Sequence, residues 1–124
     1  MPKPARRDNP GHSGRYPPEA YQFVRDALDY TVHRVNSDED GVAQDRHVTG
    51  QQLCLGMRDY ALRQYGRLAR LVFEQWNVHR TEDFGRMVYG LIDAGLLAKT
   101  PDDSIEDFDD VFDFAEAFDD VSVI

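Results

Sequence analysis

The sequence predicts a mainly α fold, a single domain of about four helices around one core. Its 124 residues suit one domain. Apolar residues recur at helical spacing in four segments between residues 17 and 95, and helix start and stop signals bound these segments. We assign residues 1–16 to a flexible basic N-terminal arm, 17–118 to the helical domain and 119–124 to a C-terminal tail.

The first helix is predicted over residues 18–35. The arm before it is rich in Pro, Gly and Arg and poor in aliphatic residues, which is typical of a flexible chain. Pro17 and Pro18 have the φ angle that suits a helix start, and Glu19 is favourable in a first turn. The apolar positions that follow lie close to one helical face: Ala20, Val24, Ala27, Leu28, Val32 and Val35.

The second helix is predicted to follow Thr49 and to end near Tyr65. Thr49 and Gln52 have the spacing of a capping box, and Gly66 suits the left-handed residue that ends many helices. Apolar side chains occupy more than one face of this helix. We therefore expect it to be central or to contact a second surface, and a homo-oligomer is one way to supply that surface.

Two more helices are predicted, over residues 67–76 and from an N-cap at Thr81 to Gly95. In the first, an apolar seam is expected from Leu68, Leu71, Val72 and Trp76. In the second, Glu82 and Asp83 favour the first turn. Five of its residues are expected in the core at near-ideal helical spacing: Phe84, Met87, Val88, Leu91 and Ile92.

After Gly95 the predicted elements are short. Residues 96–100 and part of 109–114 are extended segments that would pair as a short β-hairpin, with a turn at 101–104 between them. A short helix is expected over 113–119. This order of elements makes the C-terminal half winged-helix-like.

Two resemblances accompany these elements. Residues 90–97, GLIDAGLL, look like the end of a winged-helix recognition helix entering its wing. The blocks HVTGQQL at 47–53, WNV at 76–78 and TEDFG at 81–85 resemble a small bacterial family of uncharacterised proteins of similar length, over residues 16–118. That family has no assigned activity, so the resemblance implies a stand-alone bacterial fold and carries over no functional residue.

Charge is divided unevenly along the chain, whose net charge is −9. Residues 1–80 hold 12 Lys and Arg against 10 Asp and Glu, whereas residues 81–124 hold 2 against 13. The outer face of the fourth helix is expected to carry one cation among three anions: Glu82, Asp83, Arg86, Tyr89 and Asp93. Because neutralising phosphates supplies most non-specific affinity for nucleic acid, this face argues against a nucleic-acid partner.

The acidic end of the chain also contains phenylalanines, and it is the candidate partner-binding site: Phe108, Asp109, Asp110, Phe112, Asp113, Phe114 and Phe118. Large apolar side chains are costly to leave in water. They must therefore pack on the protein's own helices, with the acids pointing outward, or on a partner. The acids favour a basic protein partner, because opposite charge steers the encounter. A third interpretation folds the basic arm against this end.

No motif in the sequence predicts catalysis, a cofactor or a metal. Residues 36–47 begin like an EF-hand loop, but the twelfth position is His47, where calcium needs a bidentate carboxylate. The four histidines lack the paired short spacings of zinc sites, and Cys54 is expected to be a small core residue. With one cysteine, no signal peptide and no apolar run of roughly 20 residues, the chain is expected to be cytoplasmic, without a membrane partner.

These observations predict a non-enzymatic protein-interaction or regulatory module that uses its acidic-aromatic C-terminal surface. Two alternatives stay open. One is a winged-helix nucleic-acid-binding regulator, and the other is a small enzyme whose site is assembled only by the fold.

Overall fold

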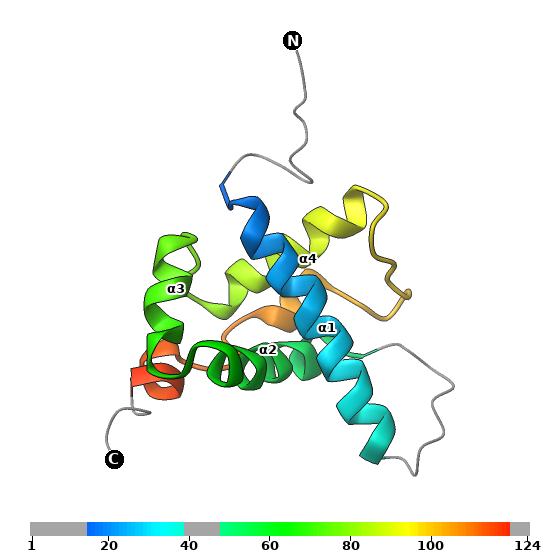
Figure 1. Cartoon of the computed structure of the whole chain (residues 1–124). Helices are drawn as coiled ribbons and strands as arrows, with labels where there is room; N and C mark the ends of the chain where they lie inside the picture. The colour runs from blue at the N-terminus through cyan, green and yellow to red at the C-terminus, as the bar shows by residue number, and fades with distance from the viewer. Residues whose placement is uncertain (1–14, 39–47, 120–124) are drawn as a thin grey trace.

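A computed structural model describes residues 15–38 and 48–119, and helices dominate this part of the chain (Figure 1). The elements in chain order are α1 (Pro18–Asp38), α2 (Gly50–Tyr65), the 3-10 turn η1 (Gly66–Leu68), α3 (Ala69–Gln75), α4 (Thr81–Asp93), the 3-10 helix η2 (Ile105–Phe108) and the π-helical turn η3 (Ala115–Asp119). The predicted mainly α class is confirmed, with four α-helices in the described ranges.

The four helices enclose one apolar core. In Figure 1, α1 passes across both α2 and α4, while α3 and the C-terminal turn η3 stand together at one edge. The segment that contains η2 returns behind α1 and packs on α2 and α4. The largest fully buried side chains come from α2, α3, α4 and the C-terminal segment: Phe73, Phe84, Phe118, Met57, Met87 and Leu91.

Helices α1 and α2 approach each other closely at Gly56. Gly56 is buried in α2, and a Cβ atom added to it would lie 1.8 Å from Thr31 Oγ1 and 2.9 Å from Thr31 Cβ. Thr31 is itself buried, and its hydroxyl donates to the carbonyl of Ala27 at 2.7 Å. Only glycine at position 56 leaves room for Thr31, so this pair sets how closely the helices pack.

Both ends of α2 agree with the prediction. The Thr49 hydroxyl accepts from the backbone N–H of Gln52 at 3.0 Å, and the Gln52 side chain accepts from the backbone N–H of Thr49 at 2.9 Å. Gly66 follows the helix with φ of +54°. The predicted capping box is therefore confirmed, and the helix ends at Gly66 with a positive φ, but the ψ of −129° there differs from the predicted left-handed helical conformation.

One residue that the sequence assigned to the N-terminal arm belongs to the core. Residues 1–14 lie outside the described part of the chain, but Tyr16, assigned to the arm, is only 4% exposed and belongs to the core. Its hydroxyl donates to Asp83 Oδ1 of α4 at 2.5 Å. This long-range hydrogen bond ties the residues before α1 to the start of α4, and no local sequence signal indicates it.

The predicted apolar seam of α3 is wrong for two of its four residues, while Val72 and Trp76 are half-buried and Trp76 packs against the core. Leu68 and Leu71 are 60% and 52% exposed, whereas Ala69 and Phe73 are fully buried. Phe73 lies at the centre of the aromatic cluster described below and therefore determines which face of α3 turns inward. In so short a helix, one large aromatic ring outweighs two leucines.

The predicted β-hairpin is also wrong. Residues 96–114 are described throughout and form turns, bends and η2, with no strand. Acidic side chains satisfy backbone N–H groups that a strand would pair: Asp103 accepts from Thr100 at 2.8 Å, and Asp107 accepts from Ser104 at 3.2 Å. Such local hydrogen bonds compete with a sheet. The winged-helix resemblance is accordingly not confirmed.

Candidate functional site

The phenylalanines of the candidate site pack on the protein's own helices. Phe108, Phe114 and Phe118 are 3%, 4% and 2% exposed, and Phe112 is half-buried. The sequence left open whether these apolar side chains pack on the protein's own helices or on a partner, and in the structure they pack in the protein's own core. An arrangement with the basic arm against this end would involve residues outside the described ranges.

Phe108 is held in a slot between two helices. A Cβ atom added at Gly50 of α2 would lie 2.9 Å from Phe108 Cε1, and one added at Gly85 of α4 would lie 2.9 Å from Phe108 Cβ. The hydroxyl of Thr81 donates to the carbonyl of Phe108 at 2.6 Å and accepts from the N–H of Val111 at 3.1 Å. Two glycines and one hydroxyl thus fix where the acidic segment crosses the core.

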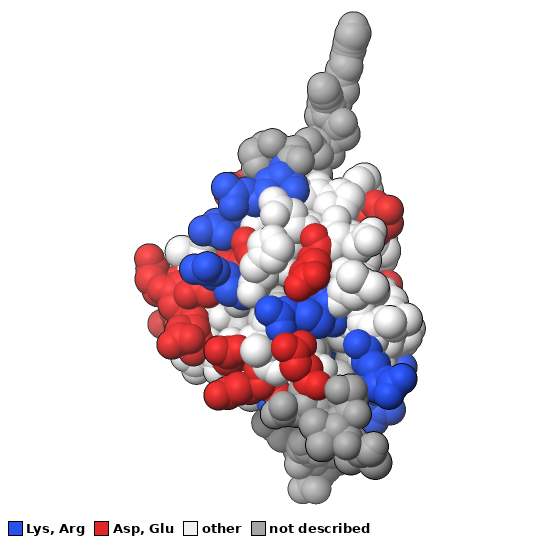
Figure 2. Space-filling model, turned by 90° about the vertical axis from the view of Figure 1, so that its left-hand side faces the viewer, with Lys and Arg blue, Asp and Glu red and all other residues white. Residues whose placement is uncertain are grey.

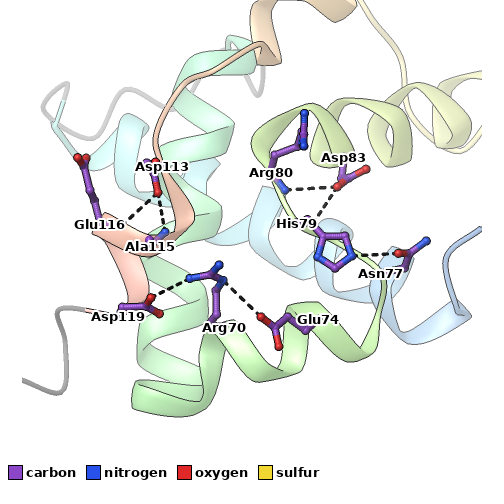
Figure 3. Close-up of polar contacts among 10 residues, drawn as sticks. All are labelled: Arg70, Glu74, Asn77, His79, Arg80, Asp83, Asp113, Ala115, Glu116 and Asp119. Atoms are coloured by element: carbon purple, nitrogen blue, oxygen red, sulfur yellow. Dashed lines mark hydrogen bonds and ion pairs between the residues drawn. The ribbon is translucent and has the colours of Figure 1, made fainter.

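The prediction that Thr81 is the N-cap of α4 is wrong. The helix begins at Thr81 itself and is preceded by Arg80. The carboxylate of Asp83 accepts from the backbone N–H groups of His79 at 2.8 Å and Arg80 at 3.3 Å (Figure 3). An acid at this position satisfies N–H groups near the helix start and complements the helix dipole.

Asp83 was assigned to the outer face of α4, and the structure corrects this. It is only 4% exposed and also accepts from Tyr16 and, at 2.6 Å, from the guanidinium of Arg86. Burial, together with the hydrogen bond to Asp83, raises the pKa of Tyr16 to about 12. The hydrogen bond from Tyr16 therefore joins the residues before α1 to the start of α4, and Asp83 does not contribute to an exposed surface, although the side chain of Arg86 is half exposed.

The last two phenylalanines surround Phe73 of α3. The ring centroids of Phe114 and Phe118 lie 5.5 and 5.4 Å from that of Phe73, and 5.1 Å from each other in an edge-to-face arrangement. Phe112 stacks on Phe114 at 5.6 Å. Its ring also lies 6.0 Å from the guanidinium carbon of Arg58, at the limit of a cation–π contact.

The acids of the same segment face solvent. We call Glu106, Asp109, Asp110, Asp113 and Glu116 the acidic surface; all five residues are exposed. Figure 2 shows that Asp and Glu gather at one side of the face that it displays, while Lys and Arg lie in separate groups with other residues between them. A hydrogen bond from Ser104 lowers the pKa of Glu106 from its ordinary value, which favours its charged form.

The end of the acidic surface is tied to α3 by charge. Asp113 Oδ1 accepts from the N–H of Ala115 at 2.7 Å, which caps the last turn, and Arg70 donates to Asp119 at 2.9 Å (Figure 3). Arg70 also lies 3.7 Å from the carboxylate of Glu74. In the described part of the chain, no Lys or Arg forms an ion pair with any of the five acids of the acidic surface.

The residues considered from the sequence for metal binding or nucleophilic attack do not form a common site in the described part of the chain. Within the described ranges, no group of three or more His, Cys, Asp or Glu side chains is placed to hold a metal ion. Residues 39–47, most of the EF-hand-like loop, lie outside those ranges. Cys54 is fully buried, and burial raises the pKa of its thiol, with a further contribution from Glu82. A buried thiol with a raised pKa is a poor nucleophile.

Two features of this region could not be predicted from local sequence patterns. The buried role of Asp83 depends on Tyr16, which is 67 positions away, and the slot for Phe108 is made by glycines from two helices.

None of the helices in the described ranges is long and apolar enough to cross a membrane. Comparisons with protein-family models, with curated proteins and with solved structures give no match.

Proposed function

We propose that this protein is a non-enzymatic interaction module, and that its acidic surface docks a basic segment of a partner protein. The observation that carries the proposal is the separation of roles within one segment. The phenylalanines anchor the segment in the core, and Glu106, Asp109, Asp110, Asp113 and Glu116 remain exposed without ion pairs to the described cations.

An anchored acidic segment suits recognition better than a loose one. Phe108 and the Arg70–Asp119 ion pair hold the backbone in place, so a partner need not pay the entropy of ordering it. Exposed charges of one sign attract a basic partner over about one Debye length, roughly 8 Å at physiological ionic strength. The binding should therefore be fast and sensitive to salt.

The same geometry disfavours the two alternatives. Eight residues of α4 are buried, among them Thr81, Asp83 and Gly85, because η2 and α1 pack on this helix. A recognition helix needs an open face for the groove of a duplex, and Arg86 and Asp93 are the only exposed residues of α4. For an enzyme, the strongest nucleophile candidate, Cys54, is buried with a raised thiol pKa. A cytoplasmic location stays a prediction, as does self-association.

The test is the binding of a short oligolysine peptide to two triple variants with the same net charge. Asp109→Asn/Asp110→Asn/Glu116→Gln neutralises three acids of the acidic surface and leaves the Asp113 cap intact. The matched control, Glu19→Gln/Asp26→Asn/Asp93→Asn, neutralises three exposed acids of α1 and α4.

The proposal predicts that the first variant binds the peptide about tenfold more weakly than the parent, since each exposed charge contributes up to about 1 kcal/mol. The control should lose much less affinity, and rising salt should weaken the binding of the parent. Equal losses in the two variants would mean that only net charge matters, and the proposed surface would be abandoned.

A further inference from the structure

A cavity lies beside the acidic segment, on the side of η2 that faces α1. Its volume is about 330 Å³, and its wall combines α1, the start of α2, α4 and the loop that leads to η2. The apolar part of the wall comes from Leu28, Leu53, Val88, Ile92, Leu97 and Phe108. Cavities of about 300–1,000 Å³ with mostly apolar walls are typical of small-molecule sites.

One polar group of the wall has no partner. The hydroxyl of Tyr89 is buried, and it forms no hydrogen bond within the described part of the chain. Tyr89 itself lies on α4 and lines the cavity. A buried hydroxyl without a partner is unfavourable, because it has lost its hydrogen bonds to water. Because Tyr89 lines the cavity, a ligand that displaces the atoms covering this hydroxyl can supply the missing bond, since a hydroxyl both donates and accepts.

The charges around this hydroxyl determine which ligand fits. Asp103 and Asp107 line the cavity, and these two carboxylates and that of Glu106 all raise the pKa of Tyr89, after the larger effect of burial. Lys99 also lines the cavity. Its ammonium donates to the backbone carbonyl of Thr100 at 3.3 Å. Three carboxylates against one ammonium give a negative potential, which favours a cation and opposes an anion.

We propose that this cavity binds a small molecule with an apolar body and a cationic amine, whose N–H group donates to the Tyr89 hydroxyl. The apolar part contacts Leu53, Val88 and Ile92, and the amine lies near Asp103 and Asp107 at the polar side of the wall. This site is distinct from the proposed docking of a basic protein on the acidic surface, although the charge of Glu106 acts on both, and neither proposal depends on the other.

The test uses three probes of one shape and different charge: 4-phenylbutylamine, 4-phenylbutanol and 4-phenylbutyrate. Each is titrated at neutral pH into the full chain, and binding is followed by the backbone amide NMR signals of α4 and residues 96–108. The amine should bind tightest and the carboxylate weakest, with about tenfold or more between them, because a charge-assisted hydrogen bond replaces a repulsion. Equal affinities, or no shifts with any probe, would overturn the proposal.

Two variants locate the site. Tyr89→Phe removes the hydroxyl and should weaken amine binding by about fivefold or more, while its melting temperature stays equal to that of the parent or rises. Ile92→Trp should fill the cavity and abolish binding of all three probes. If Ile92→Trp does not fold, Ala98→Trp on the exposed loop replaces it. Unchanged amine affinity in Tyr89→Phe, or in the cavity-filling variant, would contradict the assignment.

A last control separates this site from surface attraction. The Asp109→Asn/Asp110→Asn/Glu116→Gln variant changes the acidic surface and leaves the cavity residues unaltered. It should bind 4-phenylbutylamine as tightly as the parent does. An equal loss for the amine and for oligolysine in this variant would place both on the acidic surface, and the cavity proposal would be withdrawn.

Discussion

Replacing Gly56 with alanine tests the close crossing of α1 and α2. In an open helix, Gly→Ala stabilises by about 1 kcal/mol, because alanine is the better helix former. At Gly56 the new Cβ would lie 1.8 Å from Thr31 Oγ1 and 2.9 Å from Thr31 Cβ. A change of the Thr31 rotamer would move the oxygen but not Cβ. The two helices must therefore separate.

The expected net result is a loss of about 2 kcal/mol in the free energy of unfolding. Overpacking of a core costs roughly 1–3 kcal/mol, and the severity of this overlap puts Gly56→Ala at or above the upper end. The gain in helix propensity of about 1 kcal/mol offsets part of that cost. For a domain with a stability of about 5–15 kcal/mol, the change is large enough for urea unfolding to measure.

A double-mutant cycle identifies the cause. Thr31→Ala removes the clashing oxygen and one methyl group, and by itself it should cost about 1 kcal/mol through the lost hydrogen bond to Ala27. In the Gly56→Ala/Thr31→Ala protein, the loss of stability should be smaller than the sum of the two single-variant losses. The difference, which is the coupling energy between the two positions, should be about 1 kcal/mol or more. Leu55→Ala against Leu55→Gly, one position away and 40% exposed, measures helix propensity alone.

Two results would refute the reasoning. Gly56→Ala could stabilise the protein by about the same amount as the difference between Leu55→Ala and Leu55→Gly, about 1 kcal/mol. In that case α1 and α2 would not approach each other at this point. Alternatively, the losses of the two single variants could add without coupling, which would show that Thr31 does not occupy the space next to Gly56.

Three further predictions concern single residues. Phe108→Ala should lower the free energy of unfolding in urea by about 3–5 kcal/mol, because it empties the slot between α2 and α4. Phe112→Ala should lower it clearly less, because Phe112 is only half-buried, and equal losses would contradict the slot. Tyr16 should ionise near pH 12 in the ultraviolet titration of the folded protein. The folded state holds this proton more tightly, so the contribution of Tyr16 to stability should be constant below the ordinary tyrosine pKa of about 10 and fall as pH rises towards 12. The fall should be smaller in Tyr16→Phe, because only the other tyrosines with raised pKa values remain. Cys54 should react with a thiol reagent only as fast as the protein opens, and rapid labelling of the native state would show that it is accessible.

Local signals in the sequence predicted the helices well. The capping box of Thr49 and Gln52 and the glycine stop at Gly66 act between neighbours, and the structure has them where they were predicted. The core face of α4 was also correct for Phe84 and Leu91, because five apolar residues at helical spacing define one face without ambiguity.

Errors arose where a distant residue decides the outcome. The seam of α3 was placed on Leu68 and Leu71, but Phe73 turns inward because Phe114 and Phe118, about 40 positions later, pack against it. Two extended segments joined by a turn predicted a hairpin after Gly95. The chain forms turns there because its acids accept hydrogen bonds from nearby backbone N–H groups.

The residues of the candidate site were predicted from the sequence, but which of them are buried and which are exposed was not. The sequence singled out the segment from Phe108 to Phe118, and the structure buries its phenylalanines and leaves its acids exposed. The cavity next to it was not predicted at all. Its wall combines residues from Leu28 to Phe108, and Tyr89 was taken for a surface residue of α4. Contacts between segments so distant in sequence leave no periodic signal.

The most direct test of the proposed docking is to map oligolysine binding on the parent protein residue by residue. Backbone amide NMR shifts should change most at residues 106–116, and the side-chain signals of Phe108 and Phe114 should stay unchanged, because the acids are contacted while the phenylalanines remain in the core. Shifts spread evenly over α1 and α2, or exposure of the phenylalanines on binding, would contradict the account.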